Sequence, residues 1–238
     1  MDNDFSVSVV IVAAGRGTRA GLNMNKVYAD LKGQSVLVRS ILPFLEIPRV
    51  CQVVVSISAD DTDLFNSLVK NPEILKHNNK ILAVEGGATR QESVYNGLLK
   101  TQPECTLIAI HDGARPLVDK TDINRVFEKA YEIGGACLGV KVKDTIKRVD
   151  SDLFVMETLQ REELIAVQTP QVFKREIILD SYQKAFANHI QGSDDATLAE
   201  LAGYRVSMVP GSYDNIKITT PEDFHIAEQF LEEKRISE

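Results

Sequence analysis

The sequence predicts an α/β fold in which a mostly parallel, doubly wound, Rossmann-like sheet carries an inserted β-arm. Short β-branched runs alternate with helix-length segments along the chain, and this βαβα order is typical of parallel sheets. Several of the runs are apolar throughout, as expected for strands that are covered by helices on both faces. One segment, residues 143–168, breaks the alternation.

The expected strands are short and rich in valine and isoleucine. They are residues 8–14, 52–58, 80–86, 106–112, 136–142 and 204–210. The expected helices are residues 35–46, 60–69, 89–100, 119–133, 174–187, 194–202 and 220–234. Ser35 and Asp119 are suitable N-caps for two of these helices, and Pro221 suits an early helical position.

Residues 143–168 are the expected arm. Their polar and apolar side chains alternate on both sides of the turn-forming "DSD" at residues 150–152, a pattern that favours a β-hairpin. The chain has no Ser/Gly-rich linker and no internal repeat. We therefore expect a single domain over residues 1–238, with the arm projecting from its main sheet.

Composition narrows the class of protein. The chain is 44% hydrophobic and 26% charged with a net charge of -7, which suits a soluble globular protein and argues against a general nucleic-acid binder. Cys51, Cys105 and Cys137 have no metal-site or disulfide-framework spacing, so we expect three core thiols. The first residues carry no basic leader region, and no apolar run has membrane-span length. We expect a cytoplasmic protein.

The loop after the first expected strand, "VIVAAGRGTR" at residues 10–19, is rich in glycine. Gly15-x-Gly17-x-x-Ala20 satisfies the loose dinucleotide fingerprint. The second expected strand, however, ends at Ser58 rather than at the acidic residue that would bind a ribose. No Walker A string occurs in the chain either. The glycine pattern alone therefore leaves an NAD-dependent oxidoreductase as one alternative.

Three cations follow in the same region: Arg16, Arg19 and Lys26. A bound diphosphate needs few cations, whereas a triphosphate attacked at phosphorus needs its developing charge neutralised. The loop therefore favours a nucleoside triphosphate. The alternative is a tight strand-to-helix turn whose basic side chains are simply solvated.

Other unusual residues also follow expected strands, where ligands bind in open α/β sheets. After the third strand these residues include a glycine pair and a polar helix start, and after the later strands they include an acid at a strand tip and further cations. The residues concerned are Gly86, Gly87, Arg90, Ser93, Asp112, Arg115 and Lys217. Asp112 suits Mg²⁺, although taken singly it could be a turn cap and Lys217 a solvated lysine. We interpret His111 as structural, because no catalytic triad is recognisable.

Seven ordered motifs together resemble a known family. They are "AAGRGTR", "GGATRQESV", "HDGARP", "VKDTIKR", "QTPQVF", "SDDATLAE" and "DNIKITTPED". In these motifs the chain resembles the 2-C-methyl-D-erythritol 4-phosphate cytidylyltransferases of the nucleotidyltransferase fold, from about Val9 to Leu231. The resemblance implies that a phosphate oxygen of the acceptor attacks the α-phosphorus of CTP, that pyrophosphate leaves, and that Mg²⁺ is required.

The resemblance also implies roles for individual residues. Arg19 and Lys26 would stabilise the transition state, and Lys217 would contact the α-phosphate. The nucleotide site would comprise Ala13, Ala14, Gly15, Gly17, Gly87, Ala88, Ser93, Asp112 and Gly113, with Asp112 near the metal. The acceptor site would comprise Arg115, Thr145, Arg161, Thr169 and Ser193. In this family the arm reaches a second subunit, so Arg161 would act across a homodimer.

Three positions depart from the family pattern. Asn25 replaces the proline that usually precedes the catalytic lysine, and since asparagine is less restrictive than proline, we expect Lys26 to become ordered only with substrate. Ala88 stands where an aspartate is frequent, and Ser193 where threonine is common. Alternatives are a ribitol-5-phosphate cytidylyltransferase, a sugar-1-phosphate nucleotidyltransferase and a non-enzymatic, dimeric binding protein.

Overall fold

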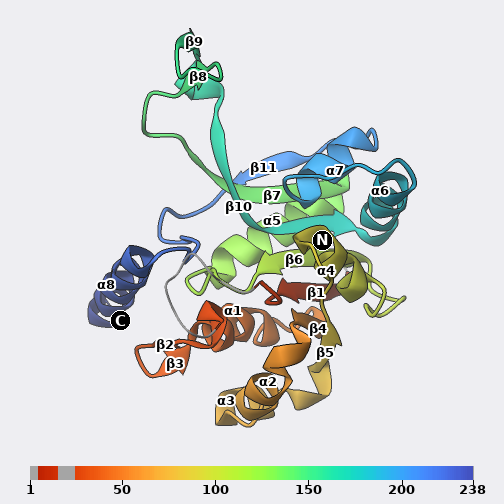
Figure 1. Ribbon diagram of the computed structural model, residues 1–238. Helices are drawn as coiled ribbons and strands as arrows, with labels where there is room; N and C mark the ends of the chain where they lie inside the picture. Colours follow the sequence, from red (N-terminus) through yellow and green to blue (C-terminus); the bar gives the residue numbers. More distant parts are fainter. Residues whose placement is uncertain (1–4, 16–24, 238) are drawn as a thin grey trace.

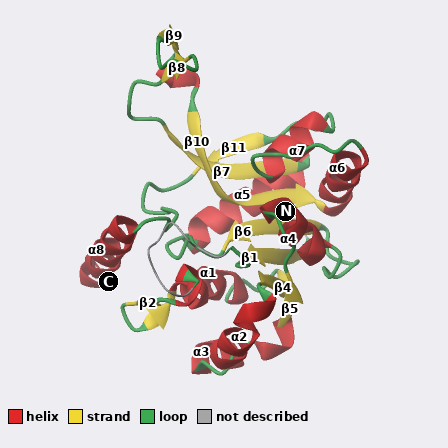
Figure 2. Cartoon of the chain, in the orientation of Figure 1, coloured by secondary structure: helices red, strands yellow, loops and turns green. Residues whose placement is uncertain are grey.

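The computed structural model describes residues 5–15 and 25–237, which form a central sheet with helices on both of its faces (Figures 1 and 2). The sheet has seven strands in the order β11-β7-β10-β6-β1-β4-β5. Their bounds are β1 Val7–Val12, β4 Val50–Ile57, β5 Ile81–Glu85, β6 Leu107–Asp112, β7 Gly135–Lys141, β10 Ile165–Lys174 and β11 Ser207–Pro210. All neighbouring pairs are parallel except those of β10, which runs antiparallel to both β6 and β7. The predicted fold class is confirmed.

Each of the seven expected helical segments contains a helix, and the short helix α3 is additional. The helices are α1 Val36–Leu45, α2 Thr62–Leu68, α3 Pro72–Leu75, α4 Arg90–Leu98, α5 Lys120–Ile133, α6 Arg175–Ala187, α7 Asp195–Leu201 and α8 Pro221–Ser237. Ser35 and Asp119 are N-caps, accepting hydrogen bonds from the amides of Val38 and Thr121, and Pro221 begins α8 as expected. No helix within the described ranges is both long and apolar enough to cross a membrane.

Successive side chains of β1 point to opposite faces of the sheet and pack in two separate core layers. Val9 and Ile11 pack with side chains of α1 and α5 on one face of the sheet, whereas Val10 packs with side chains of α4, α6 and α7 on the other. All three side chains are fully buried. A parallel strand covered in this way cannot alternate polar with apolar residues, which accounts for its mostly apolar sequence, in which Ser8 is buried too.

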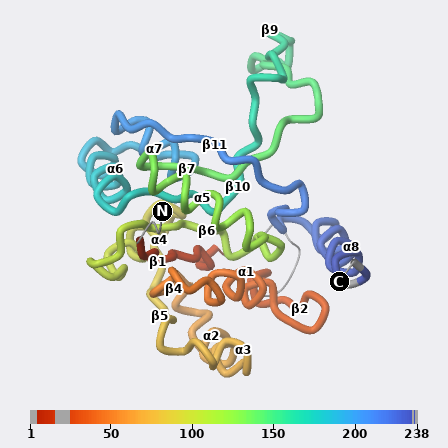
Figure 3. The backbone as a smooth tube through the Cα atoms, turned by 180° about the vertical axis from the view of Figure 1, so that it is seen from behind, coloured from red at the N-terminus to blue at the C-terminus, as the bar shows by residue number. Residues whose placement is uncertain are grey.

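The arm leaves the sheet after β7 and returns at β10. It contains the hairpin of β8 (Lys147–Val149) and β9 (Val155–Thr158), and it stands away from the sheet in both opposite views (Figures 1 and 3). We use "the arm" from here for residues 142–164. The expected end at residue 168 is too late, because residues 165–168 already belong to β10.

Several short elements connect the larger ones. They are the small hairpin of β2 (Asp30–Leu31) and β3 (Gln34–Ser35) and the 3-10 turns η2 (Lys26–Tyr28), η3 (Ala59–Asp61), η4 (Asn78–Lys80) and η5 (Arg161–Glu163). Helix α8 packs near β2 through a small cluster that includes Leu31, Ile218 and Ala227. The hairpin and α8 therefore lie together at one side of the molecule (Figure 1).

The expectation of three core thiols is wrong for two of the cysteines. Cys51 and Cys105 are paired as a disulfide, and Cys137 remains a buried free thiol. The pair joins the start of β4 to the segment before β6. Because β4 and β6 both flank β1 and run in the same direction, their first residues lie at one edge of the sheet. A separation of 54 residues conceals this proximity in the sequence.

Candidate active site

The loops after β1 and β5 pack tightly against each other at the carboxyl edge of the sheet. A Cβ atom added to Gly86 would lie 2.4 Å from the Cβ of Ala14, so this approach requires glycine. Ser93 on α4 is buried, and its Oγ accepts a hydrogen bond from the Gly87 amide at 3.0 Å. The structure thus brings together Ala14, Gly87 and Ser93. Ala13 is buried beside Gly113, while Gly15 and Ala88 are exposed at the rim.

Asp112, the last residue of β6, lies among three cations. Its Oδ2 is 2.8 Å from Lys217 Nζ and 3.6 Å from Arg115 Nε, and its Oδ1 is 3.5 Å from Arg90 Nε. These cations come from α4, from the loop after β6 and from the segment before α8. Burial by itself would raise the pKa of Asp112, but the three positive charges outweigh it and hold this pKa well below its usual range. The carboxylate stays ionised.

A chain of hydrogen bonds fixes the end of β6. His111 Nε2 faces the carbonyl oxygen of Arg115 at 3.1 Å, and because a carbonyl only accepts, Nε2 carries the proton. Burial lowers the pKa of His111 to about 4, so Nδ1 is an acceptor and receives the Thr169 hydroxyl at 3.0 Å. The same Thr169 oxygen accepts from the Asp112 amide at 3.0 Å. The interpretation of His111 as structural agrees with these contacts.

The segment that carries Lys217 is held against the loop after β6. Arg115 Nη1 donates to the carbonyl oxygen of Asn215 at 2.6 Å, and the Asn215 side-chain amide donates to the carbonyl oxygen of Thr169 at 2.9 Å. The amide of Ile218 donates to Ala114 at 2.9 Å. These bonds surround Lys217 in sequence, so its backbone is fixed while its side chain is 40% exposed.

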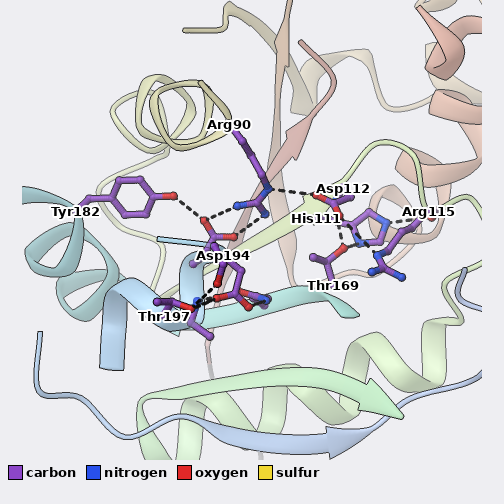
Figure 4. A network of polar contacts seen from close by, with 12 residues as sticks. Arg90, His111, Asp112, Arg115, Thr169, Tyr182, Asp194 and Thr197 are labelled. Atoms are coloured by element: carbon purple, nitrogen blue, oxygen red, sulfur yellow. Dashed lines mark hydrogen bonds and ion pairs between the residues drawn. The ribbon is translucent and has the colours of Figure 1, made fainter. Parts of the chain in front are cut away.

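Arg90 connects Asp112 with a second, deeper carboxylate. Its two terminal nitrogens contact the two oxygens of Asp195 at 3.2 and 2.8 Å, and Asp195 also accepts a 2.6 Å hydrogen bond from the Tyr182 hydroxyl. Figure 4 shows Arg90 between Tyr182 on one side and Asp112 on the other. The Asp195 side chain is completely buried, and its charge is fully paired.

Comparison with known proteins decides among the functions that this geometry would allow. A family model described as 2-C-methyl-D-erythritol 4-phosphate cytidylyltransferase (IspD) matches residues 7–233. The chain belongs to this family. It is 45% identical to the 2-C-methyl-D-erythritol 4-phosphate cytidylyltransferase of Caldanaerobacter subterraneus subsp. tengcongensis, over 95% of this chain and 99% of the relative. It is also 45% identical to the enzyme of that name from Clostridioides difficile, over 96% and 95% of the two chains.

Solved structures agree with this family assignment. The crystal structure of 4-diphosphocytidyl-2C-methyl-D-erythritol synthase from Anaerococcus prevotii superposes with a TM-score of 0.85 at 28% identity, covering 96% of this chain and 99% of that one. The 2-C-methyl-D-erythritol 4-phosphate cytidylyltransferase of Thermus thermophilus superposes with a TM-score of 0.77 at 30% identity, covering 95% and 99%. The match therefore extends over the sheet, the helices and the arm.

Asn25, the departure from the pattern of the cytidylyltransferase family, is held more firmly than its residue type predicts. Its side-chain amide donates to the carbonyl oxygen of Ala13 at 2.9 Å and to Asp61 Oδ2 at 2.8 Å. Its side-chain oxygen caps η2, which begins at Lys26. The expectation that Lys26 becomes ordered only with substrate stays a prediction. In the structure Asn25 replaces the rigidity of a proline with a buried set of hydrogen bonds.

Several predicted residues lie apart from Asp112 or outside the described ranges. Thr145 and Arg161 lie on the arm and are exposed, and Arg161 Nη1 donates to the carbonyl oxygen of Lys143 at 3.0 Å. Ser193 is exposed beside α7, with its hydroxyl 3.0 Å from that of Thr197. The predictions for Arg16, Gly17 and Arg19 fall on residues outside the described part of the chain.

The site offers limited ligands to a metal. Within the described residues, no three His, Cys, Asp or Glu side chains come together in a group that could hold an ion. Mg²⁺ is commonly bound by one or two carboxylates together with substrate phosphates and water. Asp112 supplies one such carboxylate, although Lys217 now contacts one of its oxygens. The donor set therefore fits a metal that arrives with a triphosphate.

Residue patterns alone predict no role for Asp195, Tyr182 or Asn215. Asp195 lies 105 positions from Arg90, and Asn215 lies 46 positions from Thr169. The only local signal was the paired acids of "SDDATLAE", in which the first caps α7 by accepting from the Thr197 amide and the second turns toward Arg90. Long-range pairing of this kind depends on strand order, which sequence spacing does not express.

Proposed function

We propose that this protein transfers CMP from CTP to 2-C-methyl-D-erythritol 4-phosphate and releases pyrophosphate, as part of isoprenoid precursor synthesis. The observation that carries the proposal is the group of three cations around Asp112 at the carboxyl edge of the sheet, in a chain of this family. Such a group suits phosphoryl chemistry, which depends on alignment and charge neutralisation. The reaction would take place in the cytoplasm.

The proposed chemistry needs no proton acceptor. An already ionised phosphate oxygen of the acceptor attacks the α-phosphorus of CTP, and the bond from that phosphorus to the oxygen bridging the β-phosphorus breaks. The electron pair of that bond leaves with pyrophosphate. Arg19 and Lys26 would stabilise the charge of the transition state, and Lys217 would contact the α-phosphate. His111 would stay neutral beneath the site, where its buried hydrogen bonds support this role.

The nucleotide would lie against the loops after β1, β5 and β6. Ala14 and Gly87 would bring backbone groups close to the base, while Gly15, Gly17 and Ala88 would complete the rim and Gly113 would lie under the ribose. The packing of Ala14 on Gly86 and the bond from Gly87 to Ser93 support this placement. Mg²⁺ held by Asp112 and the triphosphate would supply further charge neutralisation.

The acceptor would bind between two subunits. Arg115, Thr169 and Ser193 would contribute from one protomer, and Thr145 and Arg161 from the arm of the other. The tip of the arm supports a homodimer, because Leu153, Phe154, Val155 and Met156 are 59–78% exposed. Apolar side chains gathered in this way mark interaction surfaces.

Pyrophosphate release from CTP tests the proposed substrates. Turnover is expected with 2-C-methyl-D-erythritol 4-phosphate and much less with ribitol 5-phosphate, whereas equal or inverted rates would contradict the acceptor assignment. Titration with NAD should give no binding while CTP binds, because Arg16, Arg19 and Lys26 suit a triphosphate.

Two substitutions test the catalytic roles. Arg19→Ala and Lys26→Ala should each lower kcat by about 10²–10³-fold, by analogy with the loss of one oxyanion donor. Arg161→Ala should mainly raise KM for the acceptor. Near-normal turnover in both of the first two variants would refute the mechanism.

A further inference from the structure

Arg90 differs from the other two cations at Asp112 in having a second carboxylate of its own. Arg115 Nη1 is bonded to a backbone carbonyl, and Lys217 Nζ contacts Asp112. Arg90 instead directs two nitrogens to Asp195 and a third to Asp112. One guanidinium therefore joins a strand-tip carboxylate to a buried one.

The bond to Asp195 fixes the direction of the guanidinium. Two parallel N–H donors on one carboxylate set the plane of an arginine, which a lysine cannot reproduce. Asp195 is itself held, because it is fully buried and accepts the Tyr182 hydroxyl. With its plane set, Arg90 presents Nε to Oδ1 of Asp112 and leaves Oδ2 to Lys217 and Arg115.

We propose that Arg90 is a positioning residue for the nucleotide site: anchored by Asp195, it retains one oxygen of Asp112 so that Lys217 can leave the other oxygen for the triphosphate. This inference rests on the proposed role of Lys217. Arg90 itself touches neither substrate in this assignment. It acts through Asp112 and Lys217.

The charges around Asp112 explain why Arg90 would affect the release of Lys217 to the triphosphate. When Lys217 moves to a phosphate, the mostly buried Asp112 loses its shortest ion pair, and a buried carboxylate without a cation is costly. Arg90 and Arg115 remain and limit that cost. Without Arg90, the 3.6 Å contact with Arg115 is what remains of the chain's own cations before CTP and Mg²⁺ arrive. Lys217 is then held more tightly by Asp112, and CTP must compete harder for it.

Arg90→Lys is the most direct test. The lysine keeps a positive charge beside Asp195, so the fold is retained, but a single ammonium cannot hold both carboxylates. CTP binding measured by calorimetry should weaken about tenfold, the lower end expected for a hydrogen bond between charged groups. KM for 2-C-methyl-D-erythritol 4-phosphate should not change. Asp195→Asn keeps Arg90 but removes its charged anchor, and it should weaken CTP binding in the same direction.

Arg175→Lys is the matched control. Arg175 Nη1 donates to Thr101 and Gln102 near the start of β6, at the opposite edge of the sheet. This substitution also exchanges an arginine that makes two hydrogen bonds, so any general cost of the exchange appears in its unfolding temperature. CTP affinity should stay as in the unmodified protein.

A double-mutant cycle with Lys217→Met separates positioning from a merely structural effect. If Arg90 acts by making Lys217 available, Arg90→Lys should change CTP affinity less than twofold when Lys217 is already absent. An undiminished tenfold loss in that background would overturn the proposal, as would unchanged CTP affinity in Arg90→Lys and Asp195→Asn. Failure of the unmodified protein to bind CTP would instead refute the proposed function.

Discussion

Around Asp112 the charged side chains are paired within the chain, whereas at the tip of the arm the apolar side chains face solvent. Asp112 and Asp195 are buried and meet Arg90, Arg115 and Lys217 at hydrogen-bond or ion-pair distance. Among the residues that the structure describes, the apolar side chains at the tip of the arm have no comparable partners. Phe154, for example, is 70% exposed. The charges of the first region are paired within one chain, whereas the apolar tip of the arm is exposed.

This difference indicates that the two regions would serve different functions, charge stabilisation in one and association in the other. Groups that bear charge in a reaction must be held before substrate arrives, because preorganised charges need no rearrangement as the reaction proceeds. An apolar surface, by contrast, is stabilised by covering it, and a second copy of the chain offers the same surface in return. The arm would then bring Arg161 to a site built around the Asp112 of its partner.

The largest expected effect comes from mixing two inactive variants. Asp112→Asn disables the preorganised site, and Arg161→Ala disables the arm's contribution, so each homodimer should lose at least about 100-fold in kcat/KM. If Arg161 serves the other subunit, each mixed dimer contains one intact site. Turnover after the two are unfolded and refolded together should recover to about a quarter of the unmodified rate.

One result of this refolding experiment would exclude active sites that are formed by two subunits. If both residues served the same subunit, no combination would rebuild an intact site, and turnover would stay at the level of the separate variants. A refolded mixture of Asp112→Asn with unmodified protein gives the reference for refolding yield.

A smaller effect is expected when the tip of the arm is made polar. The double substitution Leu153→Asp and Phe154→Asp should convert a dimer into a monomer, because buried carboxylates without partners oppose association. Light scattering after gel filtration measures the mass. The unfolding temperature of the sheet should hardly change, since neither side chain packs in the core.

Leu75→Asp is the matched control for that experiment. Leu75 is 47% exposed at the end of α3, and in Figure 1 this helix lies at the opposite end of the molecule from the arm. The control should keep the mass of the unmodified protein. Equal loss of mass in both variants would mean that association does not depend on the arm.

The central parallel strands β1, β4 and β6 could be predicted because they are mostly buried on both faces. Strand β1 illustrates this, because its five apolar residues and the buried Ser8 leave little choice of structure. Strand β10 could not be predicted, because "QTPQVF" contains Pro170, and proline within a run argues against a central strand. The structure accommodates it where the register between β10 and β7 shifts, between Val167 and Gln171.

In the candidate site, too, some residues could be predicted from the sequence and others could not. Asp112 could be predicted as a site residue because strand tips in parallel sheets face ligands. Its anchor Arg90–Asp195 could not, because the pairing depends on how α7 packs beside the sheet. Asn25 shows a third case: its residue type indicated flexibility, yet its amide is bonded to Ala13 and Asp61. The hydrogen-bond partners of a side chain, and not its residue type alone, decide how firmly the backbone there is held.

Removing His111 should lower stability without any change in association. His111→Ala would delete a fully buried ring that packs on Phe44 at 5.0 Å between centroids and would leave Thr169 and the Arg115 carbonyl without partners. The expected cost is about 3 kcal/mol in the free energy of unfolding, measured with denaturant. His225→Ala is the control, because that side chain is 80% exposed.

The smallest expected effect is at Cys137, in the strand from which the arm departs. Cys137 is fully buried in β7, and burial, followed by the charge of Asp194, raises its pKa well above the ordinary value for a thiol. Alkylation needs the thiolate, so native protein should react only slowly even at pH 9, where an exposed thiol is largely ionised. The Leu153→Asp and Phe154→Asp variant should react equally slowly, because the strand keeps its neighbours β10 and β11 whether or not the arm is covered. Rapid alkylation in that variant alone would mean that the sheet depends on association for its order, and that the two regions are not independent.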